Sequence, residues 1–160
     1  MLIHFLQKIV EPKILPNLQK IDVKEKIYEY NQNGNVIKTN IYFEKDLKKI
    51  KKNMKIENKN QFNKESAAIL LVKFFEYYAY YFDYYNQKIS IHKDLTESLK
   101  TFENNVAFSI EDPFDLTHDP GRSMTLNSLQ FNKFLTAMKK EINYILNGEY
   151  LKRVDLVSKK

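Results

Sequence analysis

Titratable side chains gather in one short stretch, which reads Ile110-Glu-Asp-Pro-Phe-Asp-Leu-Thr-His-Asp-Pro-Gly-Arg122. Within it Asp112, Asp115 and His118 follow one another at three-residue intervals, and two prolines stiffen the backbone around them. An ionised carboxylate accepts hydrogen bonds, whereas a histidine N–H donates one. The stretch could therefore present two acceptors and a donor to a single pocket.

Arg122 closes this stretch and is one of only two arginines in a chain with 24 lysines. A guanidinium offers a planar fork of donors that an ammonium group cannot replace. We therefore take Arg122 as a further candidate, either to approach a phosphate or carboxylate or to orient the loop.

Simpler interpretations of the same residues remain open. Asp115 and Asp119 could be turn residues that accept hydrogen bonds from nearby backbone N–H groups. A single loop histidine such as His118 is more often structural than functional. Two carboxylates and a histidine could also hold a metal, but their spacing matches no standard metal site.

Composition places the chain among globular proteins and excludes several classes. Its 160 residues, 43% of them hydrophobic and 14% aromatic, suit one domain with a core. The absence of cysteine excludes disulfides and thiolate metal sites. The longest strongly apolar run, Ala67 to Val72, is too short to span a membrane, and the first ten residues lack the features of a signal peptide. The formal charge of +6 is compatible with RNA or phosphate binding but does not establish it.

The first part of the chain predicts a helix, a hairpin and a basic helix. Leu2, Phe5, Leu6 and Ile9 share one helical face, and the prolines at positions 12 and 16 end that helix. Strand-prone residues over 27–43 surround Asn33-Gly34, a hairpin turn signal, and predict either a short hairpin or a mobile insertion. Residues 45–60 contain seven lysines, with three apolar residues at helical spacing. These lysines could contact an RNA backbone, although a solvated helix face is the better interpretation.

The second part predicts two long helices that frame the polar stretch. One begins at an Asn63 N-cap and runs to about Tyr85, with an apolar face too broad for a peripheral helix. The other runs from about Leu126 to Asn147, before Gly148. Between them, 88–91 and 107–110 are predicted strands, and 94–102 is a predicted short helix. Most tyrosines of the first helix are expected in the core rather than stacked on bases.

The thirteen-residue stretch resembles the nucleotide-recognition motif of the poly(A)-polymerase-associated domain of terminal RNA nucleotidyltransferases. This family includes terminal uridylyltransferases and cytoplasmic poly(A) polymerases. Residues 1–20 (MLIHFLQKIVEPKILPNLQK) and 63–91 (NKESAAILLVKFFEYYAYYFDYYNQKISI) resemble it too, while 21–62 is the weakest part. The resemblance implies a mainly α (α+β) fold: a helical nucleotidyltransferase central domain with short β-strands, incomplete at its N-terminus.

In that family the motif reads the base of the incoming nucleotide beside the triphosphate. By resemblance, Asp112 and Asp115 would engage the base directly or through water. His118 would favour uracil, because its ring fills space that adenine requires. Uracil itself offers one N–H donor between two carbonyl acceptors, which fits an aspartate and a histidine N–H. UTP or ATP is thus the expected nucleotide.

The family's chemistry uses Mg²⁺ or Mn²⁺ held by clustered carboxylates on a separate N-terminal domain. That domain is introduced by a Gly-Ser pair, and no such pair occurs here. We therefore expect no catalytic residue and no metal ligand in this chain, and no activity from it alone. The missing catalytic domain would act in cis or in trans.

The sequence thus predicts the base-selecting domain of an enzyme that adds UMP or AMP to RNA 3′ ends. Its expected partners are an RNA 3′ end and a nucleoside triphosphate, without a membrane, in the cytoplasm rather than the nucleus or mitochondrion. The domain is expected over 1–148, with an insertion at 22–62 and a tail at 149–160. The alternative is a non-catalytic RNA- or protein-binding module derived from the family.

Overall fold

The computed structural model describes residues 1–21, 26–32, 34–92, 106–115 and 118–148. In order, the elements are α1 (Leu2–His4), η1 (Phe5–Ile9), β1 (Ile27–Gln32), β2 (Asn35–Asn40), α2 (Leu47–Glu57), α3 (Ala67–Glu76), η2 (Tyr77–Tyr81) and α4 (Leu129–Leu146). η1 and η2 are single π-helical turns that continue α1 and α3. The predicted short helix at 94–102 and tail at 149–160 lie outside the described residues. The mainly α fold class with short strands is confirmed.

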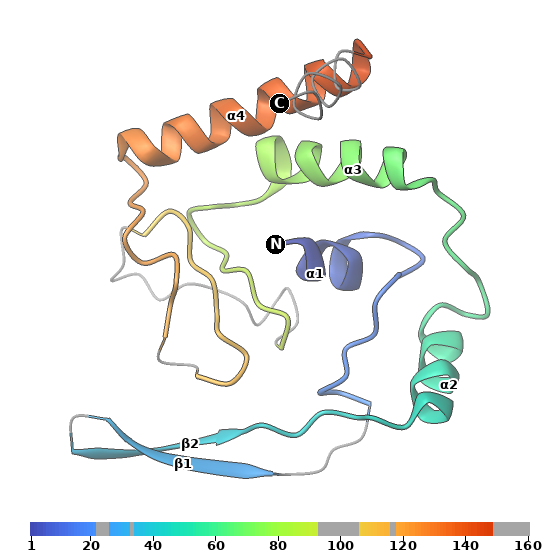
Figure 1. Ribbon diagram of the computed structural model, residues 1–160, viewed down its shortest axis with the longest axis vertical. Coiled ribbons are helices and arrows are strands. Elements are labelled where there is room, and N and C mark those ends of the chain that lie inside the picture. The colour runs from blue at the N-terminus through green and yellow to red at the C-terminus, as the bar shows by residue number, and fades with distance from the viewer. Residues whose placement is uncertain (22–25, 33, 93–105, 116–117, 149–160) are drawn as a thin grey trace, which may run out of the picture.

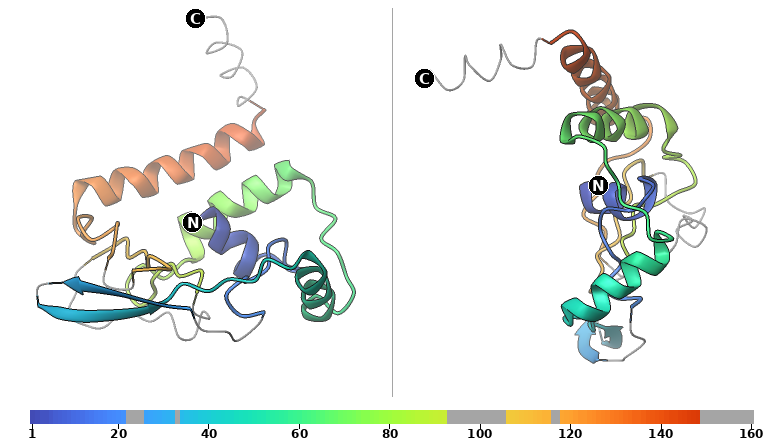
Figure 2. Two further views of the ribbon diagram at one scale, coloured as in Figure 1. Left: turned by 60° about the horizontal axis from the view of Figure 1, so that its bottom comes forward. Right: turned by 90° about the vertical axis from the view of Figure 1, so that its right-hand side faces the viewer.

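The helices and the hairpin occupy opposite ends of the molecule. α3 and α4 run alongside each other at one end, with α1 beneath α3 (Figure 1). The antiparallel hairpin of β1 and β2 lies at the other end, and α2 flanks the molecule between them (Figure 2). The hairpin pairs Gln32 with Asn35, and Gly34 adopts a φ of +85° in its turn. The predicted hairpin is thus confirmed.

The longer helices begin at side-chain caps. Asp46 caps α2 by accepting from the Lys48 N–H, and Ser128 caps α4 by accepting from the Phe131 N–H. α4 ends before Gly148, whose φ of +68° favours glycine. The helix predicted at about 126–147 is therefore confirmed, with its start three residues later.

The predicted start of α3 was wrong. Ser66, rather than Asn63, is the N-cap, and its hydroxyl accepts from the Ile69 N–H. Asn63 instead donates through its amide to the Pro12 carbonyl at 3.3 Å, a contact 51 positions away in sequence. This contact engages Asn63 before the helix begins. The helical segment also ends earlier than predicted, at Tyr81, because Phe82 is extended.

An aromatic core joins the N-terminal helix to α4. Tyr78 is fully buried and contacts Phe74 edge to face, with ring centroids 5.2 Å apart. Further ring contacts, edge to face apart from the tilted Tyr78–Phe82 pair, continue the cluster through Phe5, Phe82, Tyr84, Phe131, Phe108 and Phe134. Such pairs add about 0.5–1.5 kcal/mol each beyond the area they bury. Tyr78 and Tyr84 are therefore core residues, but Tyr80, Tyr81 and Tyr85 are exposed, so the prediction that most tyrosines of this helix are buried was only partly right.

Candidate functional site

The polar stretch is attached to the body by a short parallel pairing. The Ile89 N–H donates to the Ser109 carbonyl at 2.8 Å, and the Glu111 N–H donates to the Ile89 carbonyl at 2.9 Å. The predicted strands at 88–91 and 107–110 are reduced in the structure to this single bridge, between Ile89 and Ile110. The chain continues from this bridge to Asp112.

A buried carboxylate reinforces the pairing. Glu111 is 8% exposed and accepts from the Ser90 hydroxyl at 2.7 Å, while its second oxygen lies 2.9 Å from the Lys88 ammonium. A buried charge is stable only when it is paired and hydrogen-bonded in this way. Glu111 thus fixes the start of the polar stretch. Sequence reasoning missed this residue, because only the fold brings Lys88 and Ser90 to it.

Asp119 holds the other end of the stretch. Its Oδ2 accepts from the Ser109 hydroxyl at 2.7 Å, and its Oδ1 accepts from the backbone N–H groups of Ile110 and Gly121 at 3.0 and 2.8 Å. The turn interpretation of Asp119 is therefore confirmed. Its carboxylate closes the stretch into a loop with a fixed base.

Gly121 is required by the same closure. A Cβ at this position would lie 1.5 Å from the Phe108 carbonyl oxygen, far inside any allowed contact. Only glycine lets the two backbone segments approach so closely. The Pro-Gly pair of the motif therefore serves packing of the loop base.

Asp112 and His118 come together on the rim of this loop. Asp112 Oδ1 accepts from the Phe114 and Asp115 N–H groups at 2.9 and 3.1 Å, while Oδ2 lies 3.5 Å from His118 Nδ1. The Phe114 N–H is the main cause of a lowered pKa of Asp112, assisted by the Asp115 N–H and by His118. Asp112 is thus held as a carboxylate. The His118 side chain is 52% exposed, and so its ring is accessible to a ligand.

Asp115 and Arg122 have backbone roles in the loop. The Asp115 carbonyl accepts from the His118 N–H at 3.0 Å, and the Arg122 N–H donates to the Asp119 carbonyl at 3.2 Å. The Arg122 side chain is exposed. Of the four candidate side chains, the structure records a direct contact between Asp112 and His118.

Another histidine, His4, is a core residue. His4 is fully buried, and its Nδ1 lies 2.8 Å from the Tyr78 hydroxyl. Burial lowers the pKa of His4 to about 4, with smaller contributions from Lys8 and the N-terminal ammonium group. A neutral histidine locked against a tyrosine belongs to the core and has no part in the candidate site.

Within the described residues, no group of three His, Asp or Glu side chains could hold a metal ion. No helix in this part of the chain is long and apolar enough to cross a membrane.

Comparison with known proteins finds a family model that matches part of the chain, including this loop as far as His118. Residues 66–118 match the PAP-associated model, described as Cid1 family poly A polymerase. The matched segment starts at the α3 cap and ends at His118, and it includes Asp112 and Asp115. No curated protein matches the sequence.

Solved structures share the fold around this PAP-associated segment. The chain superimposes on a cytoplasmic RNA terminal U-transferase over 89% of its length (20% identity, TM-score 0.58) and on mtPAP bound to UTP over 91% (23%, 0.62). It also superimposes on the Cid1 poly(U) polymerase with MgGTP over 98% (21%, 0.52). These matches span 42%, 27% and 40% of the respective structures, so the chain corresponds to less than half of each. At these identities the likeness establishes the fold.

Proposed function

We propose that this chain is the base-selecting domain of a terminal RNA nucleotidyltransferase that adds UMP, or alternatively AMP, to RNA 3′ ends. The observation that carries the proposal is the pairing of Asp112 with His118 on the exposed rim of a loop whose base is locked. The match of residues 66–118 to the PAP-associated family model supports it. Related structures of Cid1 and mtPAP hold MgGTP and UTP, and Cid1 has also been solved with its short product ApU.

The local chemistry suits uracil. Asp112 Oδ1 is occupied by two backbone N–H groups, which leaves Oδ2 facing His118. When both ring nitrogens of His118 carry protons, Nδ1 points at this carboxylate and Nε2 can donate to a carbonyl of the base. Asp115 would accept the uracil N–H directly or through water, and Arg122 would approach phosphate or orient the loop. Adenine is larger than uracil and lacks its carbonyl groups, so His118 would disfavour adenine both sterically and through the lost hydrogen bond.

The complete enzyme would use Mg²⁺ or Mn²⁺ for nucleotidyl transfer, held by carboxylates of a catalytic domain joined in cis or in trans. The described residues of this chain offer no fitting cluster of carboxylates. What this chain would contribute is recognition: a rigid base for the loop, an ionised Asp112, and an exposed imidazole.

The test measures nucleotide preference in an enzyme that joins this domain to a catalytic domain. His118→Ala removes a hydrogen bond and opens space, and each change should shift discrimination by roughly 1–3 kcal/mol, or about ten- to a hundredfold. The ratio of kcat/KM for UTP over ATP should therefore fall. Asp112→Ala should weaken UTP use without admitting ATP, because it opens less space.

Asn132→Ala, an exposed change on α4, is the matched control and should leave the ratio unchanged. Equal loss of UTP and ATP use in His118→Ala would show that His118 only supports the loop. The assignment of uracil selection to His118 would then fail.

A further inference from the structure

An apolar groove lies between η1 and the segment formed by the end of α3 and η2. Phe5 and Ile9 line it from η1, and Tyr77 and Tyr81 line it from η2. Each pair is four positions apart, so its two side chains lie on the same side of their helical turn. Phe5 is only 2% exposed and Tyr81 is 68% exposed, so the groove leads from the core to the surface. Its volume of about 250 Å³ lies below the roughly 300–1,000 Å³ of pockets for drug-sized ligands and therefore suits a single side chain.

Two carboxylates give this groove a negative charge. Glu11 lines it from the η1 side and Glu76 lines it from the end of α3. Neither carboxylate has an ion pair or a side-chain hydrogen bond within the part of the chain that the structure describes. The remaining charged residue of the lining, Lys73, forms an ion pair with Glu65, which neutralises it. In a chain with a formal charge of +6, the groove is therefore a local reversal of sign.

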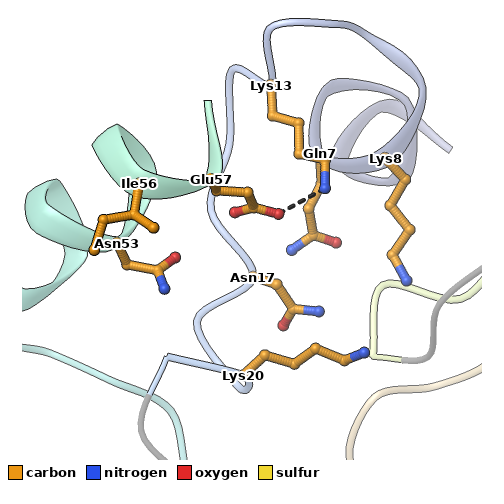
Figure 3. A pocket seen from close by; sticks show the side chains of 8 residues that line it. All are labelled: Gln7, Lys8, Lys13, Asn17, Lys20, Asn53, Ile56 and Glu57. Atoms are coloured by element: carbon orange, nitrogen blue, oxygen red, sulfur yellow. Dashed lines mark hydrogen bonds and ion pairs between the residues drawn. The ribbon is translucent and has the colours of Figure 1, made fainter. Parts of the chain in front are cut away.

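A different hollow, between η1 and α2, has the opposite character (Figure 3). The carboxylate in its lining, Glu57, is already paired with the Lys13 ammonium group at 2.6 Å. Lys8 and Lys20 line the same hollow. Of these two hollows beside η1, the groove next to α3 is thus the one that suits a cation.

We propose that this groove receives an arginine side chain of a partner protein, with the guanidinium group between Glu11 and Glu76 and against the Tyr81 ring. A guanidinium group presents a planar fork of donors that matches carboxylates, and its flat face stacks on aromatic rings. A lysine ammonium group is more strongly hydrated and makes no such planar contact. Nucleic acids and anionic lipids are disfavoured as occupants, because the same carboxylates repel phosphate. The inference is independent of the proposed function, since it concerns a protein contact and not the choice of nucleotide.

The test follows the backbone amide signals of the isotopically labelled 160-residue chain by NMR during titration with N-acetyl-arginine amide. The signals of Ile9, Val10, Tyr77 and Tyr81 should shift together along one binding curve. N-acetyl-citrulline amide has nearly the same shape without the charge and should bind about tenfold more weakly. N-acetyl-lysine amide should bind about threefold more weakly than the arginine derivative, because its ammonium group loses more hydration and does not stack.

Three variants locate the site. Glu76→Gln keeps the size of the side chain and should weaken arginine binding by about tenfold, as expected for the loss of a charge-assisted hydrogen bond. Glu29→Gln makes the same change of charge in β1, at the opposite end of the molecule, and should change the affinity by less than about twofold. Tyr81→Leu keeps an apolar side chain, removes the aromatic face and should weaken binding by about threefold. Unchanged amide signals outside the groove show that each variant is folded.

The comparison of arginine with citrulline on the unsubstituted chain needs no variant. Equal affinity for these two derivatives would reduce the groove to an apolar hollow and overturn the proposal, and equal affinity for the lysine derivative would overturn the choice of arginine. Equal effects of the two glutamate variants would show that only the overall charge matters. Shifts of the same signals on addition of Mg²⁺ alone would assign the carboxylates to a metal instead. None of these outcomes bears on the UTP/ATP ratio, so the two proposals can fail separately.

Discussion

Removing the Asp119 carboxylate should release the loop that carries His118. This carboxylate accepts from the Ser109 hydroxyl and from the Ile110 and Gly121 N–H groups, all at 3.0 Å or less. Asp119→Ala deletes the three hydrogen bonds at once. Asp119→Asn keeps an oxygen for both backbone N–H groups and places an amide N–H beside the Ser109 hydroxyl, which can turn to accept.

The expected magnitude follows from this count of bonds. At roughly 1 kcal/mol for each hydrogen bond, Asp119→Ala should destabilise the loop by about 3 kcal/mol, and Asp119→Asn by about 1 kcal/mol. Ser109→Ala removes one of the bonds and should also cost about 1 kcal/mol. In the double variant with Asp119→Ala the Ser109 change should cost almost nothing further, since its partner is already gone.

Amide hydrogen exchange reports this release directly. The Ile110 and Gly121 N–H groups should exchange about a hundredfold faster in Asp119→Ala, since 1.4 kcal/mol corresponds to a factor of ten. Ser109→Ala is the internal control, because it leaves both N–H groups bonded. If Asp119→Ala leaves their exchange unchanged, or if the Asn variant matches the Ala variant, the carboxylate does not hold the loop.

Three further outcomes are expected. Gly121→Ala should lower the free energy of unfolding, measured in urea, by about 3 kcal/mol or more, because its Cβ would overlap the Phe108 carbonyl. Gly148→Ala has open space around it and should lower this free energy by only about 1 kcal/mol, because of the positive φ. The pKa of His4 is about 4 in the folded chain against an ordinary value of 6.5, so between these pH values the unfolded chain binds a proton that the folded chain does not. The free energy of unfolding should therefore be highest above pH 6.5 and fall by up to roughly 3 kcal/mol towards pH 4. The variant His4→Phe should lose this pH dependence. Ser128→Ala should lower the free energy of unfolding by about 1 kcal/mol through loss of the α4 cap, and unchanged thermal unfolding would contradict that role.

Local sequence was sufficient for the elements that depend on neighbouring residues. Helical spacing of apolar residues located α3 and α4, and Gly148 located the end of α4. Gly34 and its strand-prone flanks located the hairpin. These features depend on backbone conformations and capping hydrogen bonds among residues close together in the chain, so the local sequence is enough to predict them.

Contacts between distant segments were decided by the tertiary structure. The Asn63 amide donates to the Pro12 carbonyl and its Oδ1 accepts from the Glu65 N–H, while Ser66 caps α3. Within the motif, the types and spacing of residues indicated a shared pocket, yet they ranked Asp112, Asp115, His118 and Arg122 together. The closure of the loop brought two of these side chains into direct contact.

The roles of buried polar residues were the least predictable. Glu111 and Gln7 carry no signal in the sequence, because nothing local distinguishes a buried carboxylate or amide from an exposed one. Their partners, Lys88 and Ser90 for one and Pro16 for the other, reach them only through the packing of the whole domain. Sequence thus determined which chemistry was available, and the fold decided which groups are desolvated, paired and aimed at a ligand, because desolvation depends on everything packed around a group.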